Sequence, residues 1–182
     1  MAMALPLYYS AEMVRALPDD GNRYETVHGE LLVSPAPRHV HQLVVARLME
    51  QLQPYLRAHP VGVLLPSPAD VSSGSDTLVQ PDLFVVEIGQ ARTMEWPQLQ
   101  HLLLAIEIVS PSSRRADRFT KRVLYQRAGI PDYWVVDIEA AAIERWTPDA
   151  TAPDLLRDTV QWQPAGVTTA LSVDIPALFA PI

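Results

Sequence analysis

The sequence predicts a mixed α/β fold in which a central β-sheet is flanked by helices. Three observations support this fold class. Residues 82–88 and 102–109 are near-continuous apolar runs typical of buried strands, and each carries a carboxylate. Residues 42–56 repeat apolar side chains at helical spacing. A second helical segment, at about 114–128, leads into another apolar strand at 132–138, which is the order expected where helices pack against a sheet.

The composition is that of a folded globular chain. Its 182 residues are 48% hydrophobic and 19% charged, and such a chain is long enough to bury a sizeable core. No apolar run approaches the ~18 residues that a membrane span requires. The mildly apolar N-terminal segment has no Lys or Arg before its short hydrophobic stretch, whereas a signal peptide begins with basic residues. The chain has no cysteine. We therefore expect a cytoplasmic protein without a membrane partner.

The N-terminal segment has the pattern of a short helix followed by a β-hairpin. Ser10 can cap a helix that begins at residue 11 and stops before Pro18. Residues 23–35 read as two short strands, joined by a tight turn at His28-Gly29. These elements precede the first long helix.

The middle of the chain contains that helix and the strands that follow it. Pro54 lies near the end of the helical pattern of residues 42–56, so we expect a kink or an end there. Residues 61–80 have the pattern of two strands or strand fragments with a polar turn nearby. The two apolar strands that carry carboxylates come next.

The C-terminal part is predicted to continue the sheet. Ser110 to Ser113 can cap the helix at 114–128, and Gly129 is well placed to end it. Residues 141–147 are expected to pair as a hairpin with the strand at 132–138. Beyond them lie a strand near Val160, another at 171–173 and a short segment at 175–179.

Basic residues are concentrated in one segment of an acidic chain. The net charge is −7, which is the wrong sign for a protein that coats nucleic acid non-specifically. Six Arg or Lys residues fall within the 14 residues 114–127 and are opposed there only by Asp117. Charge alone is compatible with a solvated helix face or with a local phosphate contact.

Two carboxylates in apolar strands call for a cation. Asp82 begins one strand and Glu107 lies near the end of another, and an ionised carboxylate is costly to bury unpaired. If the two strands are neighbours, both acids can converge on one divalent ion. A site made of oxygen ligands favours Mg²⁺ or Mn²⁺ over zinc. The helix after Glu107 could bring Lys121 to the same point.

These residues carry a resemblance to a known family. The segment "VQPDLFVV", followed by Glu107 25 residues after Asp82, resembles the core of the PD-(D/E)XK nucleases. The block "LLLAIEIVSPSSRRADRFTKRVLYQRAGIPDYWVVD" is similar to the Uma-type, restriction-endonuclease-like branch of that superfamily. The segments "YETVHGELL", "PAPRHVHQLVVARL" and "LSVDIPALF" extend the similarity over most of the chain. The resemblance implies a single restriction-endonuclease-like domain over residues 1–182, with the nuclease core at about 40–146.

The resemblance implies a DNA endonuclease that uses Mg²⁺ or Mn²⁺ to hydrolyse phosphodiester bonds. Asp82, Glu107 and the Ile108 carbonyl would hold the ion, and Lys121 would position the attacking water and stabilise the transition state. The superfamily's usual lysine position, two residues after the glutamate, is Val109 here. In the Uma-type pattern the following helix supplies the lysine instead.

Lys121 is the only lysine among 14 basic residues. Wherever a plain positive charge suffices, the chain uses arginine. An ammonium group is a compact and rotatable point charge, whereas a guanidinium is a wide planar fork. The lone lysine therefore indicates a confined site that must touch both a water molecule and a phosphate oxygen.

Further residues are assigned around this set. Glu30 matches a recurring acid of the Uma-type pattern, and is either an additional metal or water ligand or a solvent-facing strand residue. His41 matches the family's histidine and is expected near the substrate. The basic side chains that could grip neighbouring phosphates are Arg114, Arg115 and Arg118.

Other residues are expected to have structural roles. Asp117 either forms an exposed ion pair with Lys121 or orients it. Tyr125 is expected to pack, and Tyr133 and Trp134 to lie in the core or in a dimer interface. His39 and His41 diverge too much for a zinc site. The strands of residues 132–147 are a plausible apolar contact for a homodimer.

The alternative interpretation is a catalytically inactive nuclease-like module that binds protein or nucleic acid. The acidic composition favours this alternative, whereas the complete set of two acids and one lysine argues against it. The sequence leaves open whether the nucleic acid is DNA or RNA.

Overall fold

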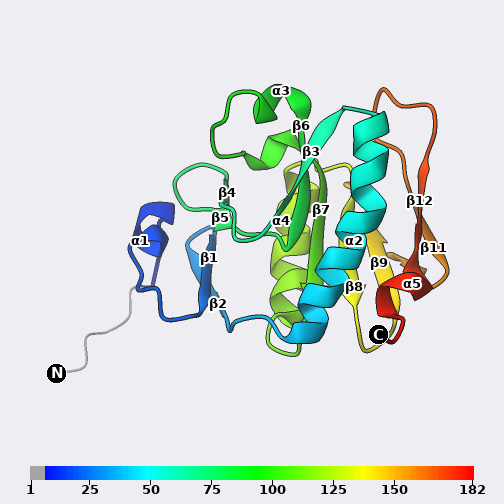
Figure 1. Cartoon of the computed structure of the whole chain (residues 1–182). Helices are drawn as coiled ribbons and strands as arrows, with labels where there is room; N and C mark the ends of the chain where they lie inside the picture. The colour runs from blue at the N-terminus through cyan, green and yellow to red at the C-terminus, as the bar shows by residue number, and fades with distance from the viewer. Residues whose placement is uncertain (1–6) are drawn as a thin grey trace.

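The structure is a computed structural model that describes residues 7–182 (Figure 1). Its helices and strands, in chain order, are α1 (Ala11–Arg15), β1 (Arg23–Val27), β2 (Glu30–Ser34), α2 (His39–Ala58), β3 (Gly62–Pro66), β4 (Val71–Ser72), β5 (Leu78–Val79), β6 (Leu83–Glu87), α3 (Ile88–Ala91), η1 (Leu99–His101), β7 (Leu102–Val109), η2 (Ala116–Lys121), α4 (Arg122–Arg127), β8 (Tyr133–Asp137), β9 (Ala142–Trp146), β10 (Asp154–Leu156), β11 (Thr159–Trp162), β12 (Leu171–Asp174) and α5 (Ile175–Phe179).

A six-stranded mixed sheet forms the centre of the fold, in the order β10-β9-β8-β7-β6-β3. Strands β7 and β8 are parallel, and every other neighbouring pair in this sheet is antiparallel. Parallel neighbours need a long crossover connection, which η2 and α4 provide here. The predicted fold class, a central mixed sheet flanked by helices, is confirmed.

Helices cover both faces of this sheet (Figure 1). Alternate residues of a strand face opposite sides. On β7, Leu104, Ile106 and Ile108 therefore join the core formed with α2 and the C-terminal hairpin β11-β12. Ala105 and Val109 join the second core, which includes Leu124 and Tyr125 of α4. Glu107, between Ala105 and Val109, faces the α4 side.

The N-terminal helix and hairpin form as predicted, and the hairpin is part of a second sheet. The Ser10 hydroxyl accepts a hydrogen bond from the Met13 amide at 3.1 Å and caps α1. His28 and Gly29 both have positive φ angles, 50° and 84°, as a two-residue hairpin turn requires. Strands β1 and β2 join β4 and β5 in a four-stranded sheet, in the order β2-β1-β5-β4.

The helix after β7 differs from a regular α-helix. It is helical over residues 114–127, close to the predicted 114–128, and Gly129 follows it with φ 73°. However, its Ala116–Lys121 segment is a π-helix, with a wider turn than an α-helix. Such segments are rare and often occur at functional sites. Both Asp117 and Lys121 lie in this π-helical segment.

Two other elements differ from the sequence expectations. Pro54 does not end α2, which continues to Ala58, so the helix is longer than the pattern of residues 42–56 at both ends. The short edge strand β10 was not predicted, because its three residues lie in a Pro-rich segment with little strand pattern.

The predicted dimer contact on the strands of residues 132–147 is wrong for β8. This strand is interior to the six-stranded sheet, between β7 and β9. Tyr133 is 1% exposed and Trp134 is fully buried, so their apolar surface is already used in the core.

Within residues 7–182, no helix has both the length and the apolar character needed to cross a membrane.

Gly62 allows β3 to pack closely against β6, the strand that Asp82 precedes. A Cβ atom at Gly62 would lie 2.6 Å from the Val86 carbonyl oxygen and 2.7 Å from Val85 Cγ1. We predict that Gly62→Ala lowers the free energy of unfolding by about 1–3 kcal/mol, because the neighbouring backbone must move. Gly89→Ala is the control, because the nearest atom to a Cβ there is 4.0 Å away.

Urea unfolding of both variants measures this difference. Gly89→Ala should stay within about 0.5 kcal/mol of the wild type or be slightly more stable. Equal free energies of unfolding for the two variants would show that close packing at Gly62 is unimportant.

Candidate active site

The pairing of β6 with β7 brings Asp82 and Glu107 together. Leu83 pairs with Ile106 in antiparallel register. Asp82 comes just before Leu83 and Glu107 just after Ile106, so the two acids lie at the same end of the paired segment. The Asp82 carboxylate also accepts a hydrogen bond from the Ile108 amide at 2.8 Å. The two predicted acids are therefore neighbours, as the sequence interpretation required.

Asp82 is 4% exposed and is held by two side chains as well as by the backbone. Arg23 donates to its Oδ1 at 2.8 Å, and the His41 Nε2 atom lies 3.0 Å from its Oδ2. Burial acts to raise the pKa of Asp82, but the hydrogen bond with His41 and the charge of Arg23 outweigh it and lower that pKa to about 2. Asp82 is thus a fully ionised carboxylate.

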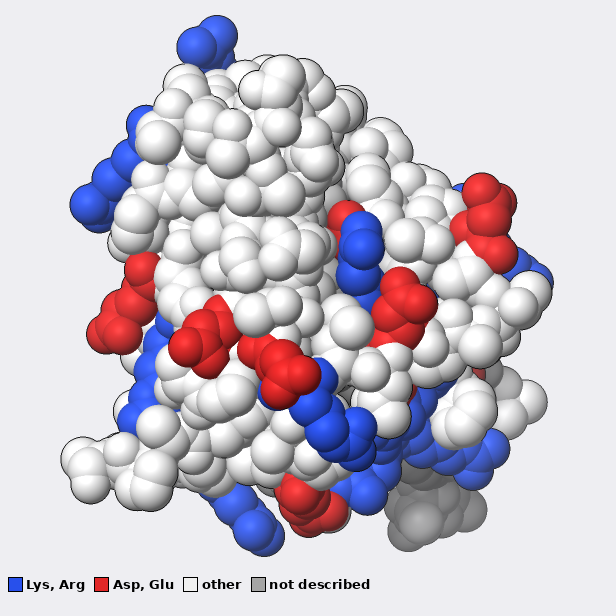
Figure 2. All heavy atoms as spheres, turned by 90° about the vertical axis from the view of Figure 1, so that its right-hand side faces the viewer, with Lys and Arg blue, Asp and Glu red and all other residues white. Residues whose placement is uncertain are grey.

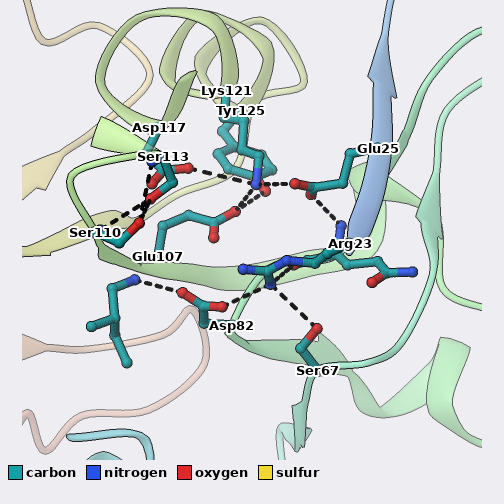
Figure 3. A network of polar contacts seen from close by, with 12 residues as sticks. Arg23, Glu25, Ser67, Asp82, Glu107, Ser110, Ser113, Asp117, Lys121 and Tyr125 are labelled. Carbon is teal, nitrogen blue, oxygen red and sulfur yellow. Dashed lines mark hydrogen bonds and ion pairs between the residues drawn. The ribbon is translucent and has the colours of Figure 1, made fainter. Parts of the chain in front are cut away.

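Glu107 and Lys121 form a buried ion pair. The Lys121 Nζ atom lies 3.0 Å from Glu107 Oε1, and these residues are only 2% and 1% exposed. The Tyr125 hydroxyl donates to the same oxygen at 3.0 Å, so this tyrosine contacts the site as well as packing in the core. Lys121 does not point into bulk solvent. The helix after β7 aims it at the acids, as Figure 3 shows.

Glu25, a residue that the sequence analysis did not single out, is the acid nearest to Lys121. Its Oε2 lies 2.7 Å from the Lys121 Nζ atom, and its Oε1 accepts a hydrogen bond from the Gln80 amide at 2.7 Å. Glu25 is 1% exposed on β1. The hairpin segment "YETVHGELL" contains two acids, and the central position of Glu25 in its strand is the signal that could have identified it.

Glu30, the other acid of that hairpin, is exposed at the start of β2. The structure does not bring it into contact with Asp82, Glu107 or Lys121. It borders a shallow hollow beside Phe119 of η2 instead.

Asp117 lies in the site and is 2% exposed, so its predicted exposed ion pair is wrong. Its Oδ1 atom lies 3.6 Å from Lys121 Nζ and accepts no hydrogen bond from the described residues. Burial raises the pKa of the Asp117 carboxyl, although Lys121 opposes the shift. The remaining expectation, that Asp117 orients Lys121, is compatible with this position.

We call the linked acidic and basic side chains of Figure 3 the charge network. Its members are four carboxylates and two cations: Glu25, Asp82, Glu107, Asp117, Arg23 and Lys121. With every group ionised the network has a net charge of −2, four negative charges against two positive. Burial, together with the neighbouring carboxylates, raises the pKa of Glu107 well above its usual range despite the charge of Lys121. The network therefore contains more carboxyl groups than cations, and a further cation would favour their ionised forms.

Three arginines were predicted to bind phosphates, and two of them are paired with acids. Arg114 donates to Glu139 at 2.6 Å. Arg118 lies 2.6 Å from Asp137 and 2.6 Å from Glu144. Arg115 is exposed and makes no ion pair within the described residues. Of the three, only Arg115 presents its charge to solvent without an acidic partner there.

Two cavities open beside the charge network. One has a volume of about 640 Å³ and is bordered by Asp82. The other has a volume of about 380 Å³ and is bordered by Ile108 and Ser110. Arg23 and His41 line both cavities, so these two side chains stand between them. His41 was expected near the site, and its contact with Asp82 places it there.

One face of the molecule lacks any continuous basic stripe. Figure 2 shows the right-hand side of Figure 1, where acidic and basic side chains are intermixed in the lower part. The upper part has a broad uncharged area, with basic side chains at its top and upper-left edges. The hairpin β11-β12 lies on this side, and residues 159–173 contain no charged residue. This face is unsuited to phosphate backbones, which bind to clustered cations.

The carboxylate oxygen atoms of Asp82 and Glu107 are the kind of ligand that Mg²⁺ and Mn²⁺ bind. Protein cations already contact both side chains, Asp82 through Arg23 and Glu107 through Lys121. Within residues 7–182, no group of three or more His, Cys, Asp or Glu side chains is arranged to hold an ion.

Removal of the buried ammonium should destabilise the protein in a pH-dependent way. We predict that Lys121→Met lowers the free energy of unfolding by about 3–5 kcal/mol near neutral pH, because Glu25, Glu107 and Asp117 lose their common cation. The folded-state pKa values of Glu107 and Asp117, which Lys121 now holds down, should then rise further. A raised carboxyl pKa penalises the folded state above that pKa, and the penalty disappears as the pH falls towards the unfolded value of about 4.

The deficit relative to the wild type should therefore shrink between about pH 8 and about pH 5, as measured by urea unfolding. Arg122→Met, at the adjacent position, is the control and should show no such recovery. A Lys121→Met deficit that is the same at both pH values would contradict this account of the network.

Comparisons with known proteins agree with the fold. A search of the curated proteins gave no match. A crystal structure described as a putative nuclease belonging to DUF820 from Anabaena variabilis ATCC 29413 superposes with a TM-score of 0.75 at 16% identity. The match covers 94% of this chain and 97% of the other, and at this identity it establishes the fold alone. The family model described as "Uma2: Putative restriction endonuclease" matches residues 11–178. The chain therefore belongs to the Uma2 family, as the motifs around Asp82, Glu107 and Lys121 indicated.

Proposed function

We propose that this protein is a metal-dependent nuclease that hydrolyses phosphodiester bonds in DNA, with Mg²⁺ or Mn²⁺ as its cofactor. One observation carries the proposal: two strand acids and the only lysine of the chain meet in one buried network beside two cavities. Membership of a family of restriction-endonuclease-like proteins supports a nucleic acid as the substrate.

The residues that would hold the ion are Asp82, Glu107 and the Ile108 carbonyl. The excess of carboxyl groups over cations in the charge network fits a divalent cation, as does Asp117 Oδ1, which accepts no hydrogen bond from the described residues. Such an ion would polarise the scissile phosphate and lower the pKa of a bound water molecule. The ionised state of Asp82, whose pKa is about 2, leaves this carboxylate able to act as a ligand across the physiological pH range.

Lys121 would act as a hydrogen-bond donor and not as a base. Burial favours loss of its proton, but the charges of Glu107 and Glu25 outweigh burial and raise the pKa of the ammonium above its usual range. A permanently protonated ammonium can stabilise the charge that develops on the phosphoryl oxygens. Glu25 would be a positioning residue, since it holds Lys121 from the opposite side to Glu107 (Figure 3).

The buried position of Lys121 supports the explanation of the lone lysine. At 2% exposure the side chain is enclosed by three carboxylates. A guanidinium is wider and donates in a fixed plane, so it would have to displace one of them.

A second candidate function, a nuclease-like binding module without catalysis, is favoured by one observation. Protein donors already contact both oxygen atoms of Asp82: Arg23 contacts Oδ1, and His41 and Ile108 contact Oδ2. A module of this kind would bind nucleic acid without binding an ion at Asp82.

The substitution Asp82→Asn separates the two functions. We predict that the wild type nicks plasmid DNA with Mn²⁺ and that Asp82→Asn loses at least about 100-fold in rate, since metal binding supplies several kcal/mol to the transition state. Calorimetry should also show an Asp82-dependent heat of Mn²⁺ binding. Asp70→Asn is the matched control, because Asp70 borders the same cavity and likewise accepts two side-chain hydrogen bonds.

Thermal unfolding would establish that both variants are folded. If the wild type leaves plasmid intact and binds no Mn²⁺ at Asp82, the binding-module interpretation is correct. If Asp82→Asn cuts as fast as Asp70→Asn, Asp82 is not a metal ligand.

Of Arg114, Arg115 and Arg118, Arg115 should contribute most to phosphate binding, because it makes no ion pair within the described residues. We predict that Arg115→Gln weakens binding to a fluorescein-labelled DNA duplex in EDTA and lowers the salt slope by about one, as expected when one phosphate contact is lost. Arg114→Gln should have a smaller effect, because Arg114 is engaged by Glu139. Anisotropy titrations at several salt concentrations test this ranking, and equal slopes for the two variants would refute it.

A further inference from the structure

We propose that Arg23 is an exchangeable cation: it occupies Asp82 in the ion-free protein and transfers to a substrate phosphate when a divalent ion binds Asp82. The inference rests on the proposed function and assigns a phosphate-binding role to a residue outside the basic segment of residues 114–127. Arg23 comes instead from β1 of the N-terminal hairpin.

The contacts of Arg23 leave most of its donors free. Its Nη1 atom donates to Asp82 Oδ1 at 2.8 Å and to the Gln80 carbonyl oxygen at 2.9 Å, and lies 3.5 Å from Ser67 Oγ. The Nε and Nη2 atoms of Arg23 make no hydrogen bond with the described residues. Neither is a buried polar atom left without a hydrogen-bond partner. A guanidinium has five N–H groups, so this side chain retains donors for a ligand.

The position of Arg23 places these donors beside open space. Its side chain is 19% exposed and lines both the 640 Å³ and the 380 Å³ cavity, whereas Lys121 is 3% exposed at its side chain and lines neither. A phosphate that enters from either cavity meets Arg23 before it can reach Lys121.

Competition for Asp82 supplies the driving force for the exchange. A divalent ion that binds Asp82 would come close to the Arg23 guanidinium, which lies 2.8 Å from Oδ1. Two cations at such a separation repel each other strongly where solvent is scarce. The guanidinium would then favour a new anion, and a phosphate offers two oxygens that match its fork.

Arg15 provides a matched comparison within the same cavity. It pairs with Asp70 at 3.0 Å, as Arg23 pairs with Asp82, and both arginines line the larger cavity. Asp70, however, is not a proposed ligand. Loss of Arg15 should therefore affect neither ion binding nor ion-dependent nucleic-acid binding.

The test uses Arg23→Gln, with Arg15→Gln as the control. In calorimetric titrations without DNA, Arg23→Gln should bind Mn²⁺ about tenfold more tightly than the wild type, because its competitor for Asp82 is gone. Anisotropy with a labelled DNA duplex should show nearly unchanged affinity in EDTA but an approximately tenfold loss in Ca²⁺, where Arg23 would contact phosphate. Arg15→Gln should change neither quantity.

Each outcome has a distinct meaning. Mn²⁺ binding that requires Asp82 but is weakened or unchanged by Arg23→Gln overturns the exchange and leaves the proposed function intact. The absence of any Asp82-dependent Mn²⁺ binding in the wild type overturns the proposed function, and the exchange with it. If Arg23→Gln does not fold, Arg23→Lys serves instead: it keeps the charge but not the fork, so Mn²⁺ affinity should stay near wild type while DNA affinity in Ca²⁺ falls. Unchanged DNA affinity in that variant would refute the phosphate contact.

Discussion

The arrangement of this site depends on the ion pairs that the buried Lys121 ammonium makes with Glu25, Glu107 and Asp117. A buried charge is tolerated only when it is closely paired, so the three segments that carry these residues must meet. They are β1 of the N-terminal sheet, β7 at the centre of the main sheet, and the helical segment after β7. The network thus links the hairpin to the central sheet through charge as well as through apolar packing.

Strand β1 contributes opposite charges to the two halves of the site. Arg23 and Glu25 are two residues apart and so lie on one face of the strand, where Arg23 contacts Asp82 and Glu25 contacts Lys121. The two strand acids consequently have different electrostatic environments: the pKa of Asp82 falls, whereas burial raises that of Glu107. Pairs of carboxyl groups whose pKa values are driven apart are common where two acids have different tasks.

The main sheet positions the acids, and its only parallel pair positions the lysine. The crossover from β7 to β8 must return along the sheet, and its π-helical segment, Ala116–Lys121, lies above Glu107. Asp117 and Lys121 are both directed inward from this segment, and Tyr125 adds a hydrogen bond to Glu107 one turn later. A solvated helix face, the simplest expectation from the charges of this segment, would have left both residues in solvent.

Local sequence patterns predicted the fold class, most strands and helices, and Asp82 and Glu107 as candidate site residues, because apolar periodicity and acids within apolar runs are properties of neighbouring residues. The family resemblance and the scarcity of lysine added Lys121 as a candidate. The tertiary structure decided what depends on contacts between distant segments. It brought Glu25 and not Glu30 to the lysine, paired Arg114 and Arg118 with acids on or next to the β8-β9 hairpin, and buried β8 within the sheet. It also placed Arg23 on Asp82 across 59 residues of chain. No local pattern specifies such partners, since the register between separate sheets sets which charges meet.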